Sequence, residues 1–189
     1  MIALRLFGMQ GGLIVAPMNT RFVCLLAVVP LLALPAAAQT KKTVPTAQAG
    51  PKKIGEFGDW IAATNSESGQ TICYAFTRVQ SSSPTLTERG KVVLTVTQRC
   101  SGRDAVAIEA GFSYPANTTV TVQVDQTGLD FYTHSQDAFA RDGKAAVAAF
   151  NRGSRAIARS PAPKVVTDTF SLKGFAQAYA AVVKACPAK

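Results

Sequence analysis

The 189-residue sequence has little of what most enzyme sites need, beginning with histidine, of which it holds only His134. A single imidazole excludes any site built from two histidines. Zinc sites normally draw paired ligands from nearby positions, whereas the cysteines are scattered. Neither a Walker loop nor a nucleophile elbow is present. We therefore expect no catalytic residues, no metal site and no cofactor. The four cysteines are Cys24, Cys73, Cys100 and Cys186.

Acidic residues are also scarce, with 11 Asp and Glu against 20 Lys and Arg, and charged residues make up only 16% of the chain. A charged fraction this low is unusual for a cytosolic globular protein and indicates an exported one. The excess of positive charge does not predict nucleic-acid binding. Base stacking needs aromatic residues among the basic ones, and none interleaves with the lysines at 41–53.

The N-terminal region predicts a secretory signal peptide over residues 1–38. Arg21 precedes an apolar stretch at 22–34, and the small residues at 36–38 form an A-x-A cleavage pattern before Gln39. The stretch is shorter than the roughly 20 residues that a membrane span needs, so we expect no span after cleavage. Because a natural signal peptide begins close to its basic residue, Met18 is the expected true start.

Residues 39–53 predict a disordered basic linker. The segment QTKKTVPTAQAGPKK carries four lysines and two prolines, with no acid and almost nothing able to enter a core. We interpret it as a solvated spacer. Residues 54–189 are then predicted to form a single β-rich domain.

Apolar residues alternate with period two through much of this domain, which predicts half-buried strands. Val120, Val122 and Val124 face one side, and after a turn at 125–128 come Leu129 and Phe131, which is typical of a hairpin. Short strands broken by Ser, Gly and Pro predict a mainly β fold, an antiparallel sandwich or barrel-like domain. The other alternating sets are Ile72, Tyr74 and Phe76; Val92, Leu94 and Val96; and Val106, Ile108, Ala110 and Phe112.

Two helices are predicted late in the chain, where the periodicity changes. Asp142 is the expected cap of a short helix from Lys144 to Asn151. Ser171 is the expected N-cap of a C-terminal amphipathic helix that packs on the sheet. Gly174 in its first turn predicts a close backbone approach. The apolar stripe of this helix is Leu172, Phe175, Ala176, Tyr179, Val182, Val183 and Cys186. Between the two helices, Ile157 and the run 165–170 predict one or two more strands.

Three cysteines remain after cleavage, which allows at most one intramolecular disulfide. We favour Cys73 with Cys186, because both lie in apolar patterns that point inward, while Cys100 lies in a polar segment. The alternatives are Cys73 with Cys100, or no disulfide. In the favoured pairing Cys100 is free, and is either unreactive or able to form a disulfide dimer.

The remaining chemical groups favour structural roles. His134 ends a predicted strand and is expected at the surface; the alternative function is a periplasmic hydrolase that uses His134 with a nearby hydroxyl or carboxylate. The carboxylate pairs Asp125 with Asp130 and Asp137 with Asp142 stand beside turns and are expected to form them. Trp60 is expected in the core, and Tyr132 points opposite to Phe131.

Three segments resemble the invasion-associated locus B family of exported bacterial proteins. They are GEFGDW at 55–60, CYA at 73–75 and, most specifically, DTFSLKGF at 168–175. The resemblance covers about residues 54–187, and its motif residues here are Gly58, Asp59, Trp60, Ser171, Leu172, Gly174 and Phe175. It implies a Gram-negative periplasmic or envelope location and a compact β-rich domain, without an established reaction. Unlike many relatives, this chain lacks a cysteine soon after GDW, which leaves Cys186 as the natural partner of Cys73.

These observations together predict an exported, periplasmic or secreted, non-catalytic domain. Its expected role is contact with an envelope or host surface component.

Overall fold

The computed structural model describes residues 50–161 and 165–188. The predicted signal peptide and linker residues 39–49 lie outside the described residues. Lys52 and Lys53, expected at the end of the linker, lie in the first strand.

Within the described residues, eleven strands form one antiparallel sheet, which confirms the mainly β fold. Their order is β1-β2-β3-β5-β6-β9-β8-β7-β10-β11-β4. The strands are β1 Lys52–Phe57, β2 Trp60–Glu67, β3 Gln70–Arg78, β4 Ser81–Ser83, β5 Val93–Arg99, β6 Gly102–Glu109, β7 Thr119–Val124, β8 Thr127–His134, β9 Asp137–Ala140, β10 Arg155–Ser160 and β11 Val166–Ser171.

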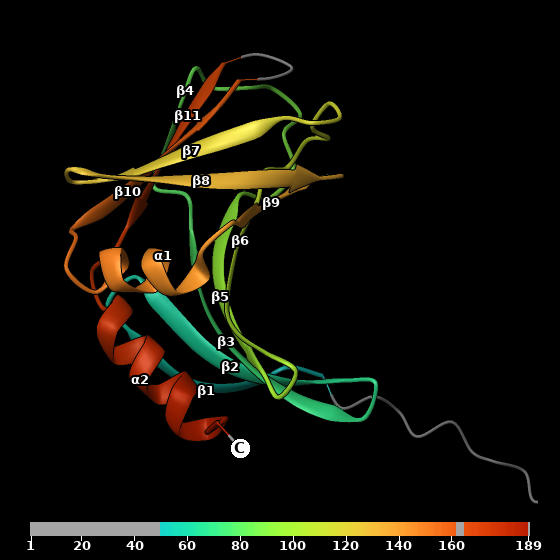
Figure 1. Ribbon diagram of the computed structural model, residues 1–189, viewed down its shortest axis with the longest axis vertical. Coiled ribbons are helices and arrows are strands. Elements are labelled where there is room, and N and C mark those ends of the chain that lie inside the picture. Colours follow the sequence, from blue (N-terminus) through green and yellow to red (C-terminus); the bar gives the residue numbers. More distant parts are fainter. Residues whose placement is uncertain (1–49, 162–164, 189) are drawn as a thin grey trace, which may run out of the picture. The chain divides into compact units, whose positions relative to one another are not determined.

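The sheet curls back on itself because β3 and β4 are nearly continuous in the chain but pair with opposite parts of the sheet. Only Val79 and Gln80 separate them, yet β4 pairs with β11 at the far end of the strand order. The Gln80 N–H donates to the Thr169 carbonyl oxygen at 2.8 Å. The result is barrel-like without being a closed barrel, and Figure 1 shows both helices on the inner side of the curl.

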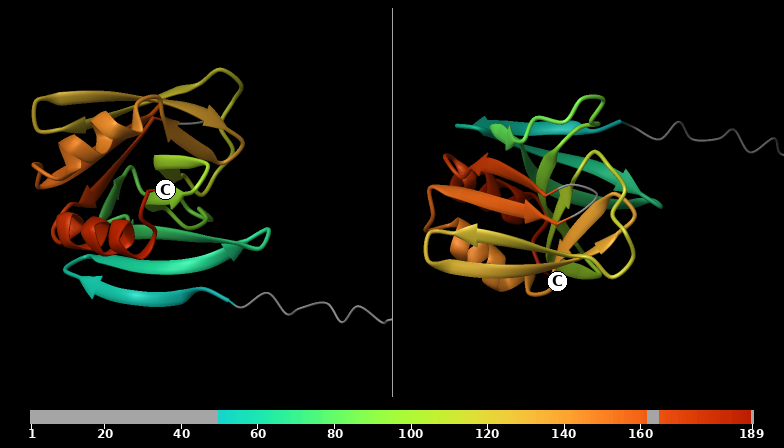
Figure 2. Two further views of the ribbon diagram at one scale, coloured as in Figure 1. Left: turned by 60° about the horizontal axis from the view of Figure 1, so that its bottom comes forward. Right: turned by 90° about the horizontal axis from the view of Figure 1, so that it is seen from above.

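The two helices fill the space between the arms of the curled sheet. Helix α1, Gly143–Phe150, packs against β6 and β8, and helix α2, Phe175–Ala185, packs against β1, β2 and β3. Figure 2 shows α1 beside the β7–β8 arm and α2 beside the arm that holds β1–β3. The predicted packing of the C-terminal helix on the sheet is therefore confirmed.

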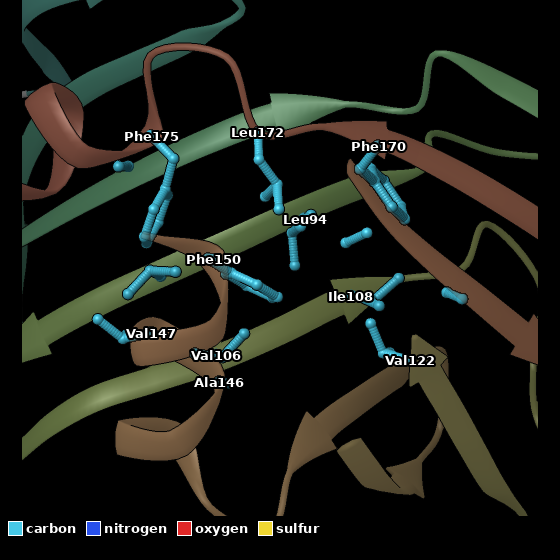
Figure 3. Packing of buried hydrophobic residues seen from close by; sticks show 14 of the residues in the cluster. Leu94, Val106, Ile108, Val122, Ala146, Val147, Phe150, Phe170, Leu172 and Phe175 are labelled. Carbon is cyan, nitrogen blue, oxygen red and sulfur yellow. The ribbon is translucent and has the colours of Figure 1, made fainter. Parts of the chain in front are cut away.

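Aromatic rings from both helices meet in the core. Phe150 of α1 and Phe175 of α2 lie edge to face, with ring centroids 5.5 Å apart, and Phe175 also meets Trp60 at 4.8 Å. Figure 3 shows Phe150 between Phe175 and the sheet residues Leu94 and Val106. All three rings are at most 1% exposed, and burying each side chain contributes on the order of 1.5–3 kcal/mol. This cluster joins the β-sheet to both helices.

The alternation predicted half-buried strands, which the structure confirms, and the expected inward orientation of Cys73 is confirmed as well. Val122 and Val124 are buried as expected. In β3, however, the buried residues are Cys73, Ala75 and Thr77, and the set of Ile72, Tyr74 and Phe76 faces outward and is half-buried. Alternation fixes which residues share a face. When both sets carry apolar atoms, it does not decide which one points inward.

The predicted cap of the first helix is confirmed, and that of the second is wrong. Asp142 accepts the Ala145 N–H through Oδ1 at 2.9 Å at the start of α1. Ser171 is instead the last residue of β11, and α2 begins after Gly174, whose φ of 89° is left-handed. The chain stays extended at Ser171 because its carbonyl and hydroxyl groups bond to the β1–β2 turn.

Candidate functional site

The motif residues from the two ends of the domain meet at one place, here called the motif joint and formed by residues 58–60 and 171–175. The Trp60 indole N–H donates to the Ser171 carbonyl oxygen at 2.9 Å. The Ser171 hydroxyl donates to Asp59 Oδ2 at 2.6 Å and accepts the Lys173 N–H at 3.2 Å. The Asp59 N–H donates to the Lys173 carbonyl at 3.0 Å. The joint thus ties the β1–β2 turn to the segment that leads into α2.

Two glycines allow the backbones in the motif joint to touch. A Cβ on Gly174 would lie 1.9 Å from the Phe57 carbonyl oxygen, which confirms the predicted close approach. A Cβ on Gly58 would lie 2.6 Å from the Lys173 carbonyl oxygen, and both glycines have positive φ. Any side chain at either position would collide with backbone, which cannot move aside as a flexible side chain can.

The remaining two motif residues fill the core beneath the joint. Leu172 is 4% exposed and Phe175 is fully buried. The motif joint also contacts β3, because the buried Thr77 donates its hydroxyl to the Asp59 carbonyl at 2.7 Å. The structure therefore brings all seven predicted motif residues together. Their polar groups mainly bond to one another and to the backbone of the joint.

An open hollow of about 280 Å³ lies beside the motif joint. Its apolar part comes from Ile61 and Phe76, which are paired across β2 and β3. Arg78, which has no ion-pair partner among the described residues, and Asp59 supply the charges. The full lining is Asp59, Ile61, Phe76, Thr77, Arg78, Gln80 and Ser171. Such a hollow can hold a small apolar group with a polar end. The Ser171 hydroxyl bonds to a carboxylate there, and no imidazole lines this wall.

His134 lies far along the sheet order from the motif joint, at the end of β8. It is exposed and stands opposite Asp137 in the β8–β9 pairing. Among the described residues its ring has no hydrogen-bond or ion-pair partner. Ser135 next to it takes a φ of 56° in the turn. Within the described residues, the hydroxyl or carboxylate that the hydrolase alternative requires is therefore not hydrogen-bonded to His134.

The members of the two predicted carboxylate pairs lie in a turn, in strands and at a helix cap. Asp125 lies in the β7–β8 turn with a φ of 49°, and that turn is shorter than predicted because Thr127 already pairs with Val124. Asp142 caps α1. In the parts of the chain that the structure describes, no group of three His, Cys, Asp or Glu side chains is arranged to hold a metal ion.

The disulfide joins Cys73 to Cys186, which is the favoured pairing. The two Cα atoms are 5.9 Å apart, and the disulfide links residues separated by 113 positions. Cys100 is free and exposed. The disulfide fastens the end of α2 to β3 and complements the motif joint at the start of the same helix.

A buried ion pair is the main polar cluster that the sequence did not predict. Arg89 forms a bidentate pair with Asp168, with both N–O distances 2.7 Å, and the two side chains are 7% and 1% exposed. Ser82 donates to Asp168 Oδ1 at 2.7 Å, and Arg89 also donates to the Ala110 carbonyl at 2.6 Å. The signal in the sequence is Asp168 itself. It stands at an inward position of a strand between Val166 and Phe170, where a charge needs a partner.

A second unpredicted cluster holds the middle of α2. The Tyr179 hydroxyl donates to Asp104 Oδ1 at 2.6 Å, and Gln98 Nε2 donates to the same oxygen at 2.6 Å. Burial, together with the hydrogen bond to the Asp104 carboxylate, raises the pKa of Tyr179 to about 12. The tyrosine therefore stays neutral and remains a hydrogen-bond donor at physiological pH, which attaches α2 to the β5–β6 hairpin.

The outer face of the sheet carries the exposed aromatic side chain that the alternation predicted. Tyr132 is 45% exposed and stacks on Phe139, with ring centroids 5.5 Å apart, while its neighbour Phe131 is fully buried. Arg141 lies near the Tyr132 ring, with its Cζ atom 5.9 Å from the centroid.

No helix in the described part of the chain is long and apolar enough to cross a membrane.

Comparison with known proteins places the chain in a family. The family model described as "Invasion associated locus B (IalB) protein" matches residues 60–183. The crystal structure of invasion associated protein B from Bartonella henselae has a similar fold, with a TM-score of 0.50 and 17% identity over 69% of this chain and 95% of that chain. A search of curated proteins gave no match. Because the family model covers more than half of the sequence, from the motif tryptophan into α2, the chain belongs to the invasion associated locus B family.

Proposed function

We propose that this protein is an exported, non-catalytic interaction domain that works in the periplasm or outside the cell and contacts an envelope or host surface component. The signal-peptide pattern at 18–38 supports export. The Cys73–Cys186 disulfide also supports it, because disulfides persist mainly in oxidising compartments. The structural neighbour is named for an association with invasion.

The observation that carries the non-catalytic part is the use of the motif residues within the fold. Asp59, Trp60 and Ser171 bond to one another's side chains and backbone. A catalytic constellation instead leaves a nucleophile and its base open toward a substrate. His134, the only imidazole, stands apart and exposed. The motif residues therefore maintain the shape of the domain, and its exposed surface is left to make contacts.

Export is tested by expressing the full chain in a Gram-negative host and fractionating the cells. We expect the protein in the periplasm or the medium, with a mature N-terminus at Gln39 by mass spectrometry. Recovery of an unprocessed chain from the cytosol would contradict the proposal.

Interaction is tested by the binding of the purified, labelled protein to envelope and host-cell membrane fractions, with unlabelled protein as competitor. We expect saturable binding for the intact protein and for Cys100→Ser, which keeps the disulfide. Binding should be weaker for Cys73→Ser, which loses the Cys73–Cys186 disulfide. Absence of saturable binding to both fractions, or a hydrolase activity that falls in His134→Ala, would count against the proposal.

A further inference from the structure

A second hollow, of about 430 Å³, places the free thiol beside the disulfide. It is lined by Gln70, Thr71, Cys100, Ala185, Cys186 and Pro187. Its wall thus carries both the unpaired cysteine and one end of the Cys73–Cys186 disulfide.

Strand register explains this proximity. In the β3–β5 pairing Cys73 stands opposite Gln98. Cys100 directly follows β5, in the β5–β6 turn, and Thr71 lies two residues before Cys73 in β3. The Thr71 carbonyl oxygen is in turn 4.0 Å from Cys186 Sγ. Thr71 is thus the shared neighbour of Cys100 and Cys186.

The end of α2 is held on the same side. Arg103, at the start of β6, donates from Nη1 to the Cys186 carbonyl oxygen at 2.7 Å. This bond keeps the Cys186 backbone beside the β5–β6 turn that carries Cys100, and it does not depend on the disulfide.

Exposure sets the direction of the reaction. Cys100 is exposed, Cys186 is half-buried at the C-cap of α2, and Cys73 is fully buried. An attacking thiolate in the hollow therefore meets Cys186 Sγ first, and the buried Cys73 sulfur is the leaving group.

We propose that Cys100 exchanges with the disulfide, so that the protein interconverts between a Cys73–Cys186 form and a Cys100–Cys186 form. Cys100 loses its proton to water, and the thiolate forms a bond to Cys186 Sγ as the Cys73–Cys186 bond breaks. The electron pair of the broken bond goes to the Cys73 sulfur, which takes up a proton. The step is an isomerisation that needs no oxidant or reductant. It transfers the tether of α2 from β3 to the β5–β6 turn.

The exchange is tested first in the intact disulfide-bonded protein. The protein is held at pH 8.5 without oxygen or added thiol, quenched with acid, unfolded, alkylated and mapped by mass spectrometry. We expect alkylated Cys73 together with a Cys100–Cys186 linked peptide, with at least ten-fold more alkylated Cys73 than in Cys100→Ser. Alkylation confined to Cys100 would overturn the proposal.

A second variant traps the alternative form. In Cys73→Ser, purified under oxidising conditions, we expect a monomer with a Cys100–Cys186 disulfide and no alkylatable thiol. If this variant unfolds cooperatively and yet keeps both thiols, or forms a Cys100–Cys100 dimer instead, the proposal fails. Should Cys73→Ser not fold, the wild-type mapping decides.

Discussion

At the scale of single residues, the Arg89–Asp168 pair is the most deeply buried ion pair among the described residues. Both charges are almost completely removed from water, and the carboxylate also accepts the Ser82 hydroxyl. Desolvating two charges costs several kcal/mol, so the intact pair adds little net stability. Removing one partner is different, because it leaves the other charge buried and uncompensated.

Asp168→Ala is therefore expected to lower the free energy of unfolding by about 3–5 kcal/mol. The matched control is Glu67→Ala, which breaks the Glu67–Arg99 pair, in which the side chains are 53% and 35% exposed. Because water screens that pair, its loss should lower the free energy of unfolding far less than the loss of Asp168 does. Urea denaturation with the disulfide intact measures both values. Similar losses in the two variants would show that Arg89 finds another partner or reaches water.

At the scale of secondary-structure elements, the motif joint determines where the last helix begins. Ser171 ends β11, and Gly174 turns the backbone so that Phe175 enters the core beside Trp60. This turn has two separate requirements, a positive φ and the absence of a Cβ. A pair of glycines in the chain allows the two to be measured separately.

Gly69→Ala tests the first requirement alone, because Gly69 has a φ of 78° and a Cβ there would meet nothing within 4 Å. Its expected cost is about 1–2 kcal/mol. Gly174→Ala adds the collision with the Phe57 carbonyl and should cost at least about 2 kcal/mol more, as overpacking does. Equal losses in urea unfolding would mean that the β1–β2 turn moves aside freely.

Sequence reasoning was most successful where the two faces of an element differ in chemistry. Val122 and Val124 alternate with polar Thr121 and Gln123, so the strand and its buried face were both predictable. In β3 both alternating sets carry apolar atoms, so the pattern of Ile72, Tyr74 and Phe76 predicted a strand without showing which face is buried.

The Arg89–Asp168 pair and the motif joint needed the tertiary structure. Their partners are 79 and 111 residues apart, so no local pattern connects them. The sequence pattern therefore identified the motif residues without showing that they contact each other. Ser171 illustrates the same limit. Its hydroxyl fits a helix cap equally well, and only Asp59 across the joint explains its actual role.

At the scale of the whole molecule, attachments along its whole length hold α2 against the sheet. They are the motif joint at its start, the Tyr179–Asp104 bond in its middle, and the Cys73–Cys186 disulfide with the Arg103–Cys186 hydrogen bond at its end. Because the disulfide encloses most of the folded chain, its main effect is to restrict the unfolded ensemble.

Cys186→Ser is expected to lower the free energy of unfolding by about 2–5 kcal/mol. Cys100→Ser, which leaves the disulfide in place, should change it by less than about 0.5 kcal/mol. Thermal unfolding of both variants beside the wild type measures the difference. A Cys186→Ser protein as stable as wild type would show that the other attachments hold the helix without the disulfide.

The contact between Trp60 and Ser171 also limits how early in synthesis the core can be completed. A ribosome releases Trp60 well before Ser171, since 111 positions separate them. The indole N–H and the ring of Trp60 thus lack two of their partners until Ser171 and Phe175 have been synthesised. Any nascent chain that stops short of Phe175 lacks the carbonyl group and the ring that Trp60 contacts in the folded domain, so its aromatic core cannot yet be complete.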